Sequence, residues 1–143
     1  MNSINKTTEL EDIKINVKMR LSALWASFMF LYIYVDYLHL YMPGVVEGIL
    51  DGKMFVFDVT QGLVLGALIS ISIPALMIFL SVALPAKVNR WTNLIVAAVY
   101  IPYSLFNVIG EEWVFFYGFG AVVEVVLLLL IIRYAWKWPR QES

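Results

Sequence analysis

The chain has 143 residues, of which 62% are hydrophobic and only 15% are charged, and its formal net charge is −1. A soluble domain is about half apolar and about one quarter charged, so this composition argues against a soluble enzyme or a basic nucleic-acid-binding domain. The absence of cysteine excludes disulfides, thiolate metal sites and cysteine nucleophiles, and a single histidine excludes a multi-histidine site within one chain. We therefore expect an integral membrane protein with no cofactor, no metal and no nucleic-acid partner.

The N-terminal segment is polar, and it differs from a cleavable signal peptide because no small-residue cleavage site follows a short apolar core. Within residues 8–20, Leu10, Ile13 and Val17 recur at helical spacing among charged side chains. The plainer interpretation is an extension of the first membrane span. The sharper one is a short helix lying at the membrane interface, and it is included in the predicted fold.

Four apolar segments are long enough to cross a bilayer, whose hydrocarbon core of about 30 Å needs roughly 20 apolar residues per helix. They run over residues 21–42, 62–84, 91–109 and 113–134. Little chain remains outside them, so residues 1–143 are predicted to form one membrane domain. The fold class we expect is an all-α membrane protein, a four-transmembrane-helix antiparallel bundle with a short N-terminal interfacial helix.

Basic residues predict the orientation of this bundle. Nine of the ten Lys and Arg residues flank the four spans on one side, and only Lys53 lies on the other. Positively charged loops remain in the cytoplasm, so both termini are predicted to face the cytoplasm from the cytoplasmic (inner) membrane. The tryptophans agree with this orientation. Trp113 lies at the outer boundary, and the tryptophans at the basic boundary are Trp25, Trp91, Trp136 and Trp138.

Small residues recur at intervals of four along the second span, at Gly62, Gly66 and Ser70, followed by Pro74. Such spacing lets another helix approach closely. We favour close packing within the monomer, with a dimer contact as the alternative. Pro74 removes one backbone hydrogen bond and predicts a kink in this span.

Three of the spans carry a stripe of polar and aromatic side chains on one helical face. Lipid offers polar groups no partner, so the three stripes are predicted to face one another inside the bundle. The stripes are Trp25, Met29, Tyr32, Asp36 and His39 on the first span; Asn93, Ala97, Tyr100, Ser104 and Asn107 on the third; and Trp113, Tyr117, Gly120 and Glu124 on the fourth.

Glu124 is the main functional candidate, because it lies near the predicted midplane and no basic residue lies at a matching depth. A carboxyl there could exchange protons or pair with a cation, or it could be a neutral group that joins helices by hydrogen bonds. Asp36 and His39 are shallower, where a hydrogen-bonded cluster with water and nearby tyrosines is the plainer interpretation. The candidate ligand- or proton-binding residues are Glu124, Asp36, His39, Tyr32, Tyr100, Asn107 and Tyr117.

Several stretches together resemble a family of small, four-helix prokaryotic membrane proteins known only as a domain of unknown function. The resemblance covers nearly the whole chain and implies four spans, but it implies no activity. A looser likeness to DoxX-type four-helix proteins rests on size and span number alone. The stretches are KMRLSALW (18–25), YIYVDYLHLYMP (32–43), PALMIFLSVAL (74–84), NRW (89–91) and YAWKWPR (134–140).

Three functions fit these patterns. The first is a small transporter or permeation subunit that uses Glu124 as its titrating or cation-binding group and assembles as a homo-oligomer. The second is an accessory subunit that binds a lipid, quinone or protein through Tyr32, Tyr100, Phe106 and Tyr117. The third is a membrane enzyme on a lipophilic substrate, which is the weakest because no nucleophile is evident. The expected partners are the bilayer, a second copy of the chain, and a lipophilic or cationic ligand.

Overall fold

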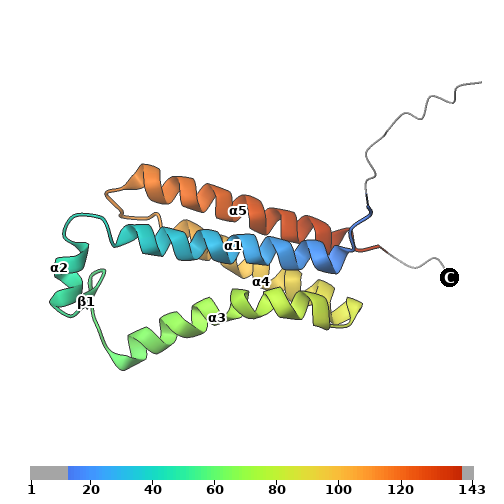
Figure 1. Ribbon diagram of the computed structural model, residues 1–143, viewed down its shortest axis with the longest axis horizontal. Coiled ribbons are helices and arrows are strands. Elements are labelled where there is room, and N and C mark those ends of the chain that lie inside the picture. Colours follow the sequence, from blue (N-terminus) through green and yellow to red (C-terminus); the bar gives the residue numbers. More distant parts are fainter. Residues whose placement is uncertain (1–12, 140–143) are drawn as a thin grey trace, which may run out of the picture.

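The computed structural model describes residues 13–139, which form five helices and one small hairpin. The four long helices coincide with the four predicted spans, and the largest shift is in the third, whose helix begins at Ala86 rather than Trp91. The elements are α1 (Val17–His39), α2 (Val45–Leu50), β1 (Lys53–Met54), β2 (Phe57–Asp58), α3 (Gln61–Ala83), α4 (Ala86–Phe106) and α5 (Val114–Trp136) (Figure 1).

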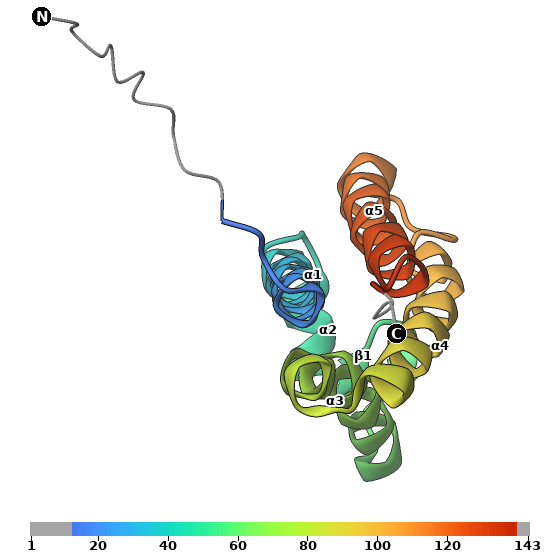
Figure 2. The same cartoon turned by 90° about the vertical axis from the view of Figure 1, so that its right-hand side faces the viewer.

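The long helices pack in the order α3, α1, α5, α4 (Figure 2). Helix α1 packs against both α3 and α5, and α4 packs mainly against α5. The fully buried side chains include Trp25, Phe28, Met77 and Leu128, whereas many large apolar side chains point outward on every long helix. An apolar exterior of this extent is typical of a protein surrounded by lipid.

Three helices in residues 13–139 are long and apolar enough to cross a membrane: α1, α3 and α5. Helix α4 has 21 residues but is less apolar than the others. Its polar residues include Asn89, Asn93 and Ser104, which are fully buried against the other helices. The structure thus supports a largely helical protein with three long apolar helices.

The N-terminal helix predicted over residues 8–20 is wrong across residues 13–16, which are not helical. Residues 8–12 of that prediction lie outside the described part of the chain. Helix α1 begins at Val17, where the Oδ1 atom of Asn16 accepts a hydrogen bond of 2.9 Å from the Lys18 backbone N–H. Asparagine is a strong N-cap because its side chain satisfies a backbone donor that the first turn leaves free, so the helix begins here.

Helix α3 bends about midway, so its first half diverges from α1 while its second half lies beside it (Figure 1). The predicted kink has its cause in Pro74, which has no N–H to donate to the carbonyl of Ser70. The hydroxyl of Tyr100 on α4 donates to that carbonyl instead. Tyr100 therefore stabilises the bend, because a carbonyl without a partner inside the bundle would be costly.

The prediction that small residues of the second span pack within the monomer is wrong at Gly62 and Gly66. A Cβ atom added at either position would meet nothing within 4 Å. The reason is the bend in α3, which moves its first half away from the other helices (Figure 1). The small residues instead line an open groove, which is described below.

Candidate functional site

Side chains from the three polar stripes meet inside the bundle, as predicted. The indole Nε1 of Trp25 donates to Oδ1 of Asn93 at 2.7 Å, which joins the first stripe to the second. The Tyr117 hydroxyl is hydrogen-bonded to Nδ1 of His39, which joins the first to the third. These two pairs lie toward opposite ends of α1 and show that parts of the stripes face one another. The prediction is wrong for Asp36, Asn107 and Trp113, which are exposed.

A buried polar network surrounds Asn93, and the sequence did not reveal its extent. The Asn93 Oδ1 atom also accepts from Ser81 Oγ at 3.2 Å, and Asn93 Nδ2 donates to Oδ1 of Asn89 at 2.7 Å. The Nδ2 atom of Asn89 donates to the carbonyl of Ser81 at 2.6 Å. Trp25, Ser81, Asn89 and Asn93 are all fully buried. The network joins α1, α3 and α4 and leaves its amides satisfied, so its role is structural.

The two carboxyls of the polar stripes, Asp36 and Glu124, lie on facing helices. Glu124 on α5 is 4% exposed and lies beside Ser104 of α4, whose buried Oγ has no hydrogen-bond partner among residues 13–139. Asp36 on α1 is close enough to Glu124 for their charges to interact, yet its side chain is exposed. The only ion pair among the described residues is Lys53–Asp58, so neither carboxyl has a Lys or Arg partner there, and the basic group nearest in charge interaction is His39, beside Asp36.

Two tyrosines lie between the carboxyls and the first half of α3. The hydroxyls of Tyr32 and Tyr103 are 3.1 Å apart, and Tyr103 lies 3.4 Å from Ser70 Oγ. Tyr32 is close enough to both Asp36 and Glu124 for electrostatic interaction. Tyr100 was among the predicted candidates, but Tyr103 was not. The reason is that Tyr103 lies off the helical face that Tyr100 shares with Ser104 and Asn107.

The far end of α1 carries the remaining candidates. The ring of His39 stacks on Phe55 with centroids 5.0 Å apart, while the Tyr117 hydroxyl bonds to its Nδ1 atom. Tyr37 and Tyr41 form their own hydrogen bond of 2.9 Å. Asn107 is exposed at the end of α4, so the structure does not bring it to the carboxyls. No group of three or more potential metal ligands occurs among residues 13–139.

A groove lies between the first half of α3 and α4, with a cavity volume of about 400 Å³. Tyr103 lines it, so the groove adjoins the tyrosine pair beside the carboxyls. The four aromatic residues predicted to line a lipid or quinone site do not line it. The lining residues are Gly62, Leu63, Gly66, Ala67, Ser70 and Tyr103.

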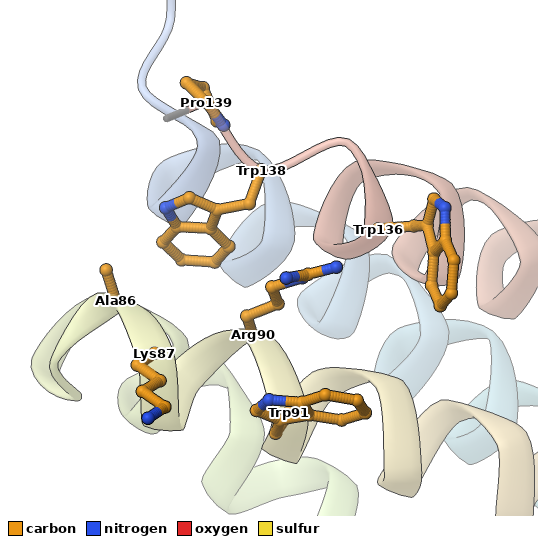
Figure 3. Close-up of a pocket in the computed structure, with 7 residues that line it drawn as sticks. All are labelled: Ala86, Lys87, Arg90, Trp91, Trp136, Trp138 and Pro139. Atoms are coloured by element: carbon orange, nitrogen blue, oxygen red, sulfur yellow. The ribbon is translucent and has the colours of Figure 1, made fainter. Parts of the chain in front are cut away.

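A second pocket lies at the opposite end of the molecule, where α4 begins and α5 ends (Figure 3). Its volume is about 240 Å³, and Arg90 projects between the tryptophan rings that line it. The sequence identified these tryptophans as markers of the membrane interface, but pattern alone could not show that they surround one arginine.

Residues 9–143 match the model of a family described as "Family of unknown function (DUF6326)". The chain belongs to this family. The predicted resemblance to a domain-of-unknown-function family is therefore confirmed, whereas the likeness to DoxX-type proteins has no support. No curated protein and no solved structure matches the chain. The family carries no assigned activity, so a functional proposal must rest on the residues themselves.

Proposed function

We propose that all four long helices span the cytoplasmic membrane, with both termini in the cytoplasm. Support for α4 as the fourth span comes from burial: Asn89, Asn93 and Ser104 lower its hydropathy, but they face the other helices rather than lipid. Support for the orientation comes from charge. Every described Lys and Arg except Lys53 lies near the start of α1, the start of α4 or the end of α5, which meet at one end of the bundle (Figure 1).

We propose further that the protein is a small transporter or permeation subunit for protons or other cations. The observation that carries this proposal is the pair of neighbouring carboxyls, Asp36 and Glu124, without a Lys or Arg partner among residues 13–139. Asp36 is exposed near the end of α1, whereas Glu124 is buried on the facing helix α5. A cation entering from the outer side would thus meet Asp36 first and Glu124 second. Charges inside a membrane are costly, and they commonly mark ion pathways.

The buried network at Trp25 and Asn93 supports the same proposal, because it separates Glu124 from the cytoplasmic end. Phe28 is fully buried, and its ring packs against both Trp25 of this network and Tyr32. A path that is open on one side and closed by packed side chains on the other is the arrangement that alternating access requires. Four helices form a thin wall, so we propose that a second copy completes it.

Glu124→Gln is expected to reduce cation flux in proteoliposomes to the level of protein-free vesicles. The amide keeps the shape of the side chain but removes its charge, which is the property that would hold a cation. An entrapped pH-sensitive dye would report proton flux driven by a potassium diffusion potential, and sodium and potassium gradients would be tested in parallel.

Glu112→Gln is the matched control. It makes the same chemical change, but at an exposed residue in the link between α4 and α5. Its flux should equal that of the unaltered protein. Flux that persists in Glu124→Gln at the level of the control would contradict the assignment of Glu124, and an inactive unaltered protein would contradict transport of these ions.

The groove favours a second candidate function, an accessory subunit that holds a lipophilic molecule. Two of its six lining residues are glycines at which a Cβ atom would meet no neighbour, and its volume suits a segment of a lipid or quinone chain. Gly66→Leu should fill the groove and abolish a lipid or quinone adduct seen by native mass spectrometry after mild extraction. Gly118→Leu, at a position equally free of neighbours, should keep the adduct. An unaltered protein that is free of any adduct would contradict this function.

A further inference from the structure

The pocket at the start of α4 joins positive charge to a set of large aromatic rings. It is built from the first turns of α4 and the last residues of the described chain, which Figure 3 shows converging on Arg90. Its position differs from that of the carboxyls and the groove, and the proposed transport path does not use it. The lining residues are Ala86, Lys87, Arg90, Trp91, Trp136, Trp138 and Pro139.

Arg90 is held in place by the rings rather than by a carboxylate. Its Cζ atom lies 5.7 Å from the ring centroid of Trp91 and 5.7 Å from that of Trp136. Its Nε atom is buried and has no hydrogen-bond partner among residues 13–139, and no described acid forms an ion pair with it. Stacked rings fix a guanidinium plane while leaving its donors available, which is how arginine binds planar, multi-oxygen anions.

The surroundings of Arg90 also favour an anion. Lys87 lies on the same turn and lines the pocket, and no acidic residue of the described chain lies at this end of the bundle. Helix α4 begins after Pro85 without a side-chain cap, so the backbone N–H groups of its first turn add partial positive charge near Ala86.

We infer that this pocket binds an anionic phosphate ester, and that its occupant is the headgroup of an anionic phospholipid in the cytoplasmic leaflet. Tryptophans concentrate at the depth of lipid headgroups, and basic pockets between membrane helices on the cytoplasmic side bind anionic headgroups. Trp136 and Trp91 are half exposed or more, so they can contact the lipid glycerol and upper acyl chains while Arg90 binds the phosphate. This inference rests on the membrane placement and is independent of the transport proposal.

The test measures lipid binding to the full-length protein by native mass spectrometry in mild detergent. Dioleoyl phosphatidylglycerol is titrated against dioleoyl phosphatidylcholine, which has the same chains and no net charge. We expect the anionic lipid to bind about tenfold more tightly, and Arg90→Gln to remove most of that difference, because a hydrogen-bonded charge pair is lost. Arg133→Gln, which removes an exposed arginine of α5 outside the pocket, should bind like the unaltered protein.

A second variant keeps the test decisive if Arg90→Gln folds poorly. Lys87 is exposed, so Lys87→Glu should fold normally and should weaken binding of phosphatidylglycerol through charge repulsion. Lys14→Glu makes the same change at an exposed position outside the pocket and should have little effect. Equal binding by Lys87→Glu and Lys14→Glu would overturn the inference, as would equal affinity for the two lipids.

Glycerol 3-phosphate distinguishes the two sources of a phosphate ester. If it does not displace bound phosphatidylglycerol at millimolar concentration, the occupant is a membrane lipid, as we infer. If it displaces the lipid and binds alone with the same dependence on Arg90 and Lys87, the pocket is a phosphate site that takes a soluble ester, and the lipid assignment is overturned. Flux through the Glu124 path should be unchanged by Lys87→Glu, which separates the two proposals.

Discussion

Replacing Asn93 by alanine is expected to lower the free energy of unfolding by about 2–4 kcal/mol, because several buried polar groups lose their partner at once. Asn93 accepts from Trp25 and Ser81 and donates to the side chain and backbone of Asn89. None of these groups can reach water or lipid headgroups, since all four residues are fully buried. The effect should appear as a lower midpoint in an unfolding titration of the protein in bicelles.

Asn107→Ala provides the matched comparison for this effect. The residue type, the substitution and the helix are the same, but Asn107 is exposed at the C-terminal end of α4. Its unfolding midpoint should remain close to that of the unaltered protein. If the two variants unfold at the same midpoint, the network contributes no stability beyond helix propensity, and its structural role would have to be abandoned.

Replacing Gly120 by leucine is expected to destabilise the contact between α1 and α5 by about 1–3 kcal/mol, the usual cost of overpacking. A Cβ atom at Gly120 would already lie 3.1 Å from Cγ2 of Val35, before the rest of a larger side chain is added. Valine is branched at Cβ and has few alternative rotamers in a helix, so the helices must separate. The effect should appear as a lower midpoint in an unfolding titration of the protein in bicelles.

Gly118→Leu separates crowding from the loss of glycine itself. Gly118 lies on the same helix, two residues earlier, and a Cβ atom there would meet nothing within 4 Å. Leucine also has the higher helix propensity, so this variant should be neutral or slightly more stable. A Gly118→Leu protein as unstable as Gly120→Leu would show that close approach to Val35 is not what requires glycine.

The long helices and the contacts between their polar stripes could be predicted from the sequence. Both follow from the free-energy cost of placing polar backbone or side-chain groups in lipid. This cost gives apolar segments of bilayer length, and it places Trp25, Asn93 and Tyr117 on inward faces. It also located the candidate carboxyls, Asp36 and Glu124, on facing helices. These predictions needed only helical periodicity and the thickness of a bilayer.

What could not be predicted depends on three-dimensional detail that periodicity does not contain. Pro74 indicated a kink, but not its direction, and the direction decides that Gly62 and Gly66 line a groove. Asn89 fell outside the predicted span of residues 91–109, so its place in the buried network was missed. Arg90 lay next to that boundary too, and only the structure shows Trp91 and Trp136 on either side of its guanidinium.

The bend at Pro74 allows the first half of α3 to pivot relative to its second half. Its second half is held by buried Met77 and Ser81, and the loop after it by Lys18, whose Nζ atom donates to the carbonyl of Leu84 at 2.7 Å. From Pro74 to Gln61 the arm is about 20 Å long, so roughly 10° of further bending moves its tip by about 3 Å. Tyr100 donates to the carbonyl of Ser70 and therefore contacts α3 next to the bend. A small change in the hydrogen bond between Tyr100 and Ser70 would therefore change the width of the groove most at its Gly62 end.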